Sequence, residues 1–162
     1  MTDPNLISIL PARRTDLDAI LTLERSGFAA SERWSERSWS GELLGEGRTV
    51  LIARRHVPVG VIALRTAGTS ADLYRLVVAP PYRRYGVGTQ LIEAGLHTVR
   101  HLGARSVLLE VDYHNEAAIC LYQQIGFEQL AARENYYGPG RSALILKLYD
   151  LPHWAGAVRS DD

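Results

Sequence analysis

The sequence of 162 residues has a single cysteine, Cys120, which excludes an intramolecular disulfide and a zinc cluster of several cysteines. It also lacks an excess of either charge, because 18 lysine and arginine residues balance 18 aspartate and glutamate residues. No overall field therefore draws the chain to nucleic acid or to an anionic membrane. The histidines show no paired ligand spacing, so we expect no bound metal.

Long apolar runs are missing as well. Runs such as Val59 to Leu64 are far shorter than the roughly 20 residues of a membrane span. No basic region with an apolar core and a cleavage site follows Met1. Apolar residues make up 46% of the chain and charged residues 22%, which is typical of a globular protein. We expect one cytoplasmic domain at 1–150 and a loosely held C-terminal tail at 151–162.

The spacing of apolar residues divides the chain into strands and helices. The order of elements is a strand, two helices, three strands, a helix, a strand, a helix and two strands, which indicates a mixed α/β sandwich. Thr15, Ser35 and Asn115 are the expected helix N-caps, and Trp34 and Trp39 form a hydrophobic staple. The expected bounds are about 6–10, 15–27, 35–46, 49–54, 59–66, 71–78, 88–102, 106–111, 115–126, 127–134 and 142–148.

The most informative segment is Pro-Pro-Tyr-Arg-Arg-Tyr-Gly-Val-Gly-Thr-Gln-Leu at 80–91, between an apolar strand and an amphipathic helix. Gly86 and Gly88 allow positive φ and close backbone approach, and the helix N-terminus adds free N–H groups. Spacing alone leaves two interpretations open, a pyrophosphate-binding loop and a surface turn with two solvated arginines. The missing Gly-Lys-Ser/Thr excludes a Walker loop, and Leu91 in place of a third glycine disfavours a dinucleotide fold.

The sequence around this loop resembles the patterns of two known protein families. Arg83-Arg84-Tyr85-Gly86-Val87-Gly88 resembles the Arg/Gln-x-x-Gly-x-Gly/Ala signature of the Gcn5-related N-acetyltransferases, the GNAT superfamily. Residues 73–148 resemble more closely the RimI family of ribosomal-protein alanine N-acetyltransferases. The matching stretches are Leu-Val-Val-Ala-Pro at 76–80, Leu-Glu-Val at 109–111, Asn-Glu-Ala-Ala-Ile-Cys-Leu-Tyr at 115–122, Ile-Gly-Phe at 125–127 and Asn-Tyr-Tyr at 135–137.

The resemblance implies a mostly antiparallel sheet of about seven strands flanked by about four helices, with acetyl-CoA between two splayed parallel strands. Those strands would be 71–78 and 106–111. The backbone of Leu76, Val77 and Val78 would pair with the pantetheine arm like an added strand, while their side chains belong to the core. Further cofactor contacts are implied for Arg83, Arg84, Tyr85, Gly86, Val87, Gly88, Thr89, Asn115 and Tyr122.

The resemblance also implies two catalytic residues. Glu110 would act as the base, directly or through water. Strand alternation places it on the face opposite Leu109, where a solvated or salt-bridged glutamate is the other interpretation. Tyr122 would protonate the departing thiolate, since a phenol with a pKa of about 10 keeps its proton at neutral pH. Pattern alone makes Tyr122 a core residue. The resemblance implies direct acetyl transfer, so we expect Cys120 to be a small buried hydrophobe rather than a nucleophile.

The implied reaction is acetylation of a protein N-terminal amine, with a small-subunit ribosomal protein that begins with alanine as the family's acceptor. Tyr136 and Tyr137 would hold the acceptor together with Glu110, and Trp34 would form the opposite wall or serve only as a staple. An α-amine with a pKa of about 8 is deprotonated more readily than a lysine with a pKa of about 10.4. A lysine or small-amine acetyltransferase and a non-catalytic acyl-CoA-binding module remain alternatives. We expect no nucleic acid or membrane partner, and a monomer or weak dimer.

Overall fold

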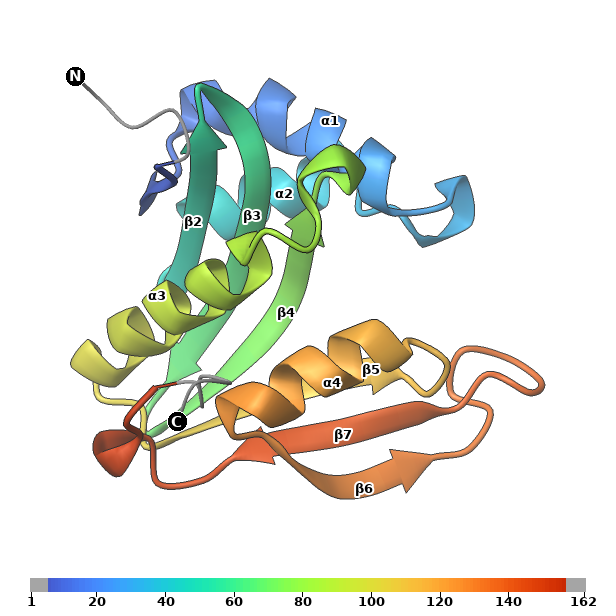
Figure 1. The fold of residues 1–162 in the computed structure, drawn as a ribbon. Helices are drawn as coiled ribbons and strands as arrows, with labels where there is room; N and C mark the ends of the chain where they lie inside the picture. The colour runs from blue at the N-terminus through green and yellow to red at the C-terminus, as the bar shows by residue number, and fades with distance from the viewer. Residues whose placement is uncertain (1–5, 157–162) are drawn as a thin grey trace.

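The computed structural model describes residues 6–156 and folds them into one central sheet with helices on both faces (Figure 1). The strands in this range are β1 (Ser8–Pro11), β2 (Arg48–Arg55), β3 (Val57–Ala67), β4 (Ser70–Val78), β5 (Ser106–Asp112), β6 (Glu128–Arg133) and β7 (Ala143–Leu148). The α-helices are α1 (Leu17–Gly27), α2 (Glu36–Leu44), α3 (Val87–His101) and α4 (Glu116–Ile125). Within the described residues no helix is both long and apolar enough to cross a membrane.

The seven strands follow the order β1-β2-β3-β4-β5-β7-β6, and every neighbouring pair is antiparallel except β4 and β5. These two parallel strands pair only from Ser70 with Ser106 to Leu73 with Leu109. Beyond that point β4 continues to Val78 without a neighbour on this side, and the two strands diverge (Figure 1). The mostly antiparallel sheet with a splayed parallel pair is therefore confirmed.

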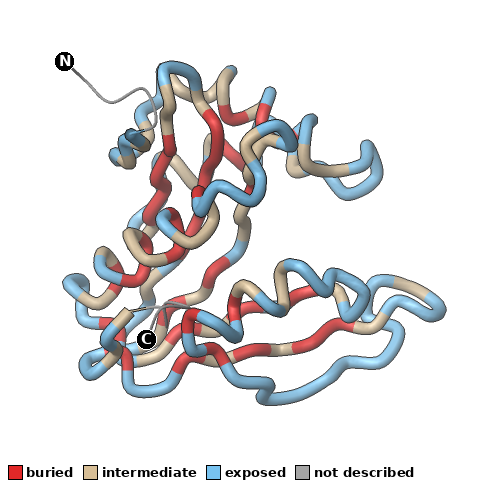
Figure 2. Tube along the Cα trace, in the orientation of Figure 1, coloured by how far each residue is buried: buried red, intermediate tan, exposed pale blue. Residues whose placement is uncertain are grey.

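Apolar side chains form one core layer on each face of the sheet. Helices α3 and α4 cover one face, with Leu91 and Leu96 of α3 packed on β3 and β4. Gly95 allows this close approach, because a Cβ atom there would lie 2.8 Å from Leu64 Cδ1. Helices α1 and α2 cover β2, β3 and β4 on the other face through Ile20 and Trp39. Buried residues accordingly follow the central strands and the inner sides of the helices (Figure 2).

Two local predictions differ from the structure. The helix expected from Thr15 begins with a 3-10 turn at Arg14–Asp16, and Asp16 rather than Thr15 precedes α1, without a side-chain cap. The loop expected at 56–58 reduces to His56, whose φ is 67°, so Pro58 already belongs to β3. Proline is tolerated there because it lies near the first residue of the strand and beside a register shift of the β2–β3 pair.

The segment after residue 150 packs against the domain. Leu151–His153 form a 3-10 helix, Leu151 is fully buried, and the Trp154 indole N–H donates to the Ile125 carbonyl at 2.9 Å. A loosely held tail therefore does not describe residues 151–154, since two apolar side chains there reach the core. Residues 157–162 lie outside the described part, and a domain boundary at residue 150 stays a prediction.

Candidate active site

The N-terminus of α3 offers free backbone donors. Gly86 precedes the helix with φ of 79°, Arg84 has φ of 69°, and no side chain caps the first turn. The first N–H groups of a helix have no intrahelical acceptor, so an anion can bind them. A Cβ atom on Gly86 would meet nothing within 4 Å, which leaves open space beside these amides. The loop thus fits a pyrophosphate, although its occupation stays a prediction.

The other loop residues have distinct surroundings. Arg83 is not simply solvated, because its Nε donates to the Val78 carbonyl at 3.0 Å. Tyr85 is exposed, with the Arg55 guanidinium 6.0 Å from its ring centroid. Gly88 lets α3 approach α4, since a Cβ atom there would lie 3.2 Å from Leu121 Cδ2. The remaining two residues of the expected set, Val87 and Thr89, are buried and half-buried respectively.

The free edge of β4 lies next to this loop. Val77 is a core residue as predicted, and the other two side chains, Leu76 and Val78, are half-buried. The Val77 carbonyl is directed at β3, where it would lie 3.0 Å from a Cβ atom on Gly60. The next carbonyl along a strand points the opposite way, and Arg83 occupies it. An added strand at Val78 would therefore share that carbonyl with the Arg83 side chain or displace this side chain from it.

Glu110 lies on β5 one residue beyond the last pair with β4. Its side chain is 36% exposed and its Oε1 is 3.4 Å from Arg133 Nη1 of β6, so the salt-bridged interpretation is correct in part. Asp72 is close enough for the Glu110 charge to affect its pKa. Desolvation raises the pKa of Asp72, Arg65 lowers it and Glu110 adds to the rise. Glu110 therefore stands on an open, charged face of the sheet.

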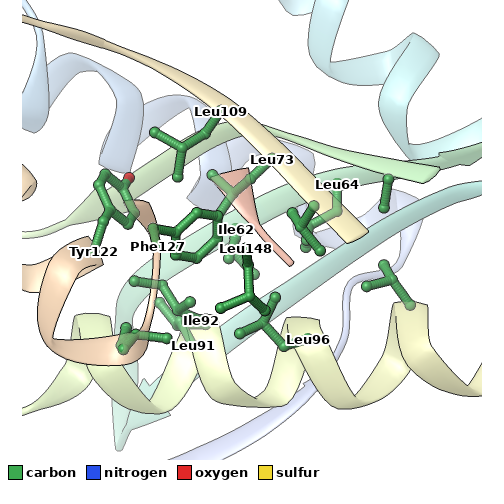
Figure 3. Packing of buried hydrophobic residues seen from close by; sticks show 14 of the residues in the cluster. Ile62, Leu64, Leu73, Leu91, Ile92, Leu96, Leu109, Tyr122, Phe127 and Leu148 are labelled. Atoms are coloured by element: carbon green, nitrogen blue, oxygen red, sulfur yellow. The ribbon is translucent and has the colours of Figure 1, made fainter. Parts of the chain in front are cut away.

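Tyr122 is 7% exposed and packs in the core beside Phe127, with ring centroids 5.7 Å apart (Figure 3). The interpretation as a core residue is confirmed for the ring. Among the described residues its hydroxyl has no hydrogen-bond partner, and burial raises the pKa of Tyr122. A neutral phenol with a free donor suits a general acid, and that role stays a prediction.

Helix α4 positions two further predicted residues. The Asn115 side chain accepts a hydrogen bond from the Ala118 N–H at 3.2 Å, which confirms the cap. Cys120, however, is exposed, so the expectation of a buried hydrophobe is wrong. Tyr122 and Ile125 define the buried face of the helix, and a residue two positions before Tyr122 points away from it.

The loop between β6 and β7 carries the aromatic pair. The rings of Tyr136 and Tyr137 lie 5.1 Å apart, and both side chains are partly exposed. Desolvation raises the pKa of Tyr137, and the carboxylates of Glu110 and Asp112 raise it further. The structure thus brings the tyrosine pair and the predicted base to one region of the molecule.

Trp34, in the connection between α1 and α2, makes the predicted staple. Its ring centroid lies 5.1 Å from that of Trp39, which confirms the contact. Its backbone N–H donates to Glu24 at 2.9 Å, and the Arg75 guanidinium lies 5.1 Å from its ring centroid. Its role as a wall of the acceptor cleft stays a prediction.

Several residues near this region were missed by the sequence reasoning. Glu24 is buried and forms an ion pair with Arg75, which also donates to the Glu32 carbonyl at 2.8 Å. Arg141, before β7, reaches both Glu32 and Asp112. Two signals were available in the sequence, because Glu24 falls on the apolar stripe of its helix and Asp112 shares a strand face with Glu110. No local pattern indicates the arginine partners.

The site combines uncapped helix amides, a strand edge opened by divergence and a glutamate at the mouth of that opening. These are features that the resemblance to the GNAT superfamily predicts for a protein that binds acetyl-CoA. Residues 15–127 match the model of the Acetyltransferase (GNAT) family. The chain therefore belongs to the GNAT acetyltransferases, and it is an acetyl-CoA-dependent N-acetyltransferase.

Individual relatives agree with the more specific resemblance. The chain is 33% identical over 134 residues to a [ribosomal protein bS18]-alanine N-acetyltransferase of Salmonella typhimurium, covering 82% of this chain and 87% of the relative. It is 35% identical over 149 residues to an N-alpha-acetyltransferase of Sulfurisphaera tokodaii, covering 83% and 88%. The crystal structure of the ribosomal-protein-S18-alanine N-acetyltransferase from Escherichia coli superposes with a TM-score of 0.81 at 25% identity, covering 97% and 99%. The resemblance to the RimI family is thus confirmed.

Proposed function

We propose that this chain transfers the acetyl group of acetyl-CoA to the α-amine at a protein N-terminus. The observation that carries the proposal is the place of Glu110, just beyond the last β4–β5 pair and near Tyr137. The names of the Salmonella and Sulfurisphaera relatives support this acceptor class. A ribosomal small-subunit protein that begins with alanine is the first candidate, and such an acceptor places the reaction in the cytoplasm.

The reaction needs a neutral amine, a bound thioester and a proton for the sulfur. Acetyl-CoA, when bound, supplies the acetyl group as an activated thioester. The amides around Gly86 and Gly88 hold its pyrophosphate, and Asn115 adds a contact to its arm. Glu110 takes a proton from the amine, directly or through water, as the amine nitrogen bonds to the acetyl carbon. Tyr122 gives its proton to the departing sulfur, so that an amide and free coenzyme A result.

Acceptor choice follows from the cost of deprotonation. An α-amine with a pKa of about 8 loses its proton near neutral pH far more readily than a lysine with a pKa of about 10.4. One glutamate is therefore sufficient for an N-terminus. The partly exposed pair Tyr136 and Tyr137 supplies aromatic surface and hydroxyl donors for an extended peptide beside that glutamate.

Acetylation of short peptides that begin with Ala, Ser, Gly or Met, compared with free polyamines and with lysine blocked at its α-amine, tests the acceptor. We expect the peptides to be preferred, with alanine first. A preference for polyamines or for the lysine side chain contradicts the proposal. Mass spectrometry of protein N-termini from cells with and without the chain then identifies the natural acceptor.

Replacement of the base tests the chemistry. Glu110→Gln should lower kcat by about 10²- to 10⁴-fold, the usual contribution of a general base. The Kd for coenzyme A by calorimetry should change little, because the pyrophosphate binds at α3. Glu128→Gln, on the exposed strand β6, is the matched control and should retain full kcat. Unchanged turnover in Glu110→Gln excludes Glu110 as the base.

A further inference from the structure

Arg141 makes ionic contacts with two acids that are remote from it in the sequence. Its Nη2 lies 2.5 Å from Glu32 Oε1 and 3.3 Å from Asp112 Oδ2. Its guanidinium carbon is 5.8 Å from the centroid of the Tyr137 ring. One arginine side chain thus links three parts of the chain that surround the proposed acceptor cleft.

The two acids come from different elements of the fold. Glu32 ends the 3-10 helix Ala30–Glu32 between α1 and α2, two residues before Trp34. Asp112 ends β5 on the same face as Glu110, about 7 Å further along the strand. Arg141 therefore joins the α1–α2 connection to the end of β5, next to the carboxylate proposed to receive the proton.

Both anchors of this link are held by other groups. The Arg141 carbonyl accepts a hydrogen bond from the Tyr137 N–H at 2.9 Å, which closes the turn before β7. The Glu32 carbonyl accepts from Arg75 Nη2 at 2.8 Å, and the buried Glu24 fixes Arg75. Hydrogen bonds to Glu32 and Asp112 raise the pKa of Arg141, so its guanidinium stays protonated at every physiological pH.

We propose that Arg141 is a specificity-determining residue. It offsets one of the two negative charges of Glu32 and Asp112, so that the acceptor residues after the amine meet a wall with one net negative charge instead of two. This inference rests on the proposed function. The second and third residues of an extended acceptor lie about 3 to 7 Å from its amine, within reach of Asp112 when the amine is at Glu110. With Arg141 in place, lysine or arginine at these acceptor positions gains less electrostatic attraction than it would beside two free carboxylates.

Three peptides that begin with alanine and differ only at the next two residues, Ala-Ala, Arg-Arg or Glu-Glu, test the inference. Arg141→Ala should raise the ratio of kcat/KM for the Arg-Arg peptide over the Glu-Glu peptide at least tenfold, because two carboxylates become free. Glu32→Gln should lower the same ratio below the wild-type value, because Arg141 is then paired with Asp112 alone and the net negative charge is removed. Arg141→Lys should stay near the wild-type ratio.

Arg54→Ala is the matched control, since Arg54 also forms an ion pair of 2.5 Å, with Asp16 at the far side of the sheet. Arg54→Ala should leave kcat/KM for all three peptides unchanged. If Arg141→Ala raises KM equally for every peptide, the residue only stiffens the loop and the inference is wrong. If the wild-type chain acetylates none of the peptides, the proposed function fails and the inference fails with it.

Discussion

The two proposed catalytic side chains have opposite surroundings. Glu110 is open to solvent and forms an ion pair with Arg133, whereas Tyr122 is buried in the core. This asymmetry suits the reaction, because a base must meet an acceptor that arrives from water. An acid that protonates sulfur works best where water does not compete.

The buried phenol should affect stability at high pH. Burial raises the pKa of Tyr122 in the folded protein above the value of about 10 expected when unfolded. Folding therefore favours the protonated form, and its contribution is complete below pH 10 and is lost as the pH rises towards the folded pKa. The stability of wild type relative to Tyr122→Phe should fall above pH 10 by up to about 1.4 kcal/mol per pH unit. Urea unfolding of both proteins at several pH values measures this stability difference. A difference that stays constant from pH 8 to 11 contradicts the prediction.

Short-range patterns carried the residue predictions that succeeded. Alternation along β5 placed Glu110 on the face opposite Leu109, and the cap at Asn115 needs only its own helix. Arg133 and Arg141 were not predicted, because each finds its acid across the fold from a strand or loop with no signal of its own. Cys120 was misplaced because an apolar residue next to the buried stripe of a short helix can fall on either face.

At the scale of elements, a buried ion pair ties helix α1 to strand β4. Glu24 accepts hydrogen bonds from Arg75, from the Trp39 indole at 3.2 Å and from the Trp34 backbone. Arg75 also stacks on Phe28, with its guanidinium carbon 3.5 Å from the ring centroid. The connection between α1 and α2 is therefore anchored to β4 immediately beyond the point where β4 leaves β5.

Loss of this carboxylate should be severe. Glu24→Ala leaves Arg75 without its ion pair and two N–H groups without an acceptor, so stability should fall by about 3 to 5 kcal/mol. Denaturant unfolding measures the change. Arg54→Ala, which breaks a more exposed ion pair, should cost at most about 1 kcal/mol. Equal losses in the two variants would show that burial adds nothing to the Glu24 pair.

Element order was predictable, and element ends were less so. Apolar periodicity and the caps at Ser35 and Asn115 gave every strand and α-helix in sequence order. Periodicity cannot show where β4 stops pairing with β5, because that depends on a partner strand. The divergence came instead from the family resemblance, and the register confirms it.

On the scale of the whole molecule, the C-terminal segment closes the core at one end. Leu151 is fully buried, and the rings of Trp154 and His97 of α3 lie 5.3 Å apart. No pattern in the residues indicates this packing, since a leucine and a tryptophan among proline and glycine lack any period. Their packing depends on the surface that α3 and α4 together present.

Truncation of that leucine should therefore be costly. Leu151→Ala should lower stability by about 2 to 5 kcal/mol, as expected for a buried leucine replaced by alanine. Leu130→Ala, at a half-exposed position of β6, is the control and should change stability by no more than about 0.5 kcal/mol. Thermal or urea unfolding measures both, and similar values for the two would mean that the segment after residue 150 adds nothing to the fold.

The edge strand β6 differs from the unpaired stretch of β4 in the middle of the sheet. All six residues of β6 are exposed, and the strand has a register shift between Gln129 and Ala131 and charged residues at both ends, Glu128 and Arg133. Irregularity and charge discourage another chain from adding there. The unpaired stretch of β4 also has a register shift, at Tyr74, and a charged residue, Arg75. However, Arg75 pairs with the buried Glu24, and the stretch ends on the apolar residues at 76–78. We therefore expect the pantetheine amides to pair with β4 at 76–78, in the middle of the sheet, and we expect the charge and irregularity of β6 to disfavour an added strand at the rim.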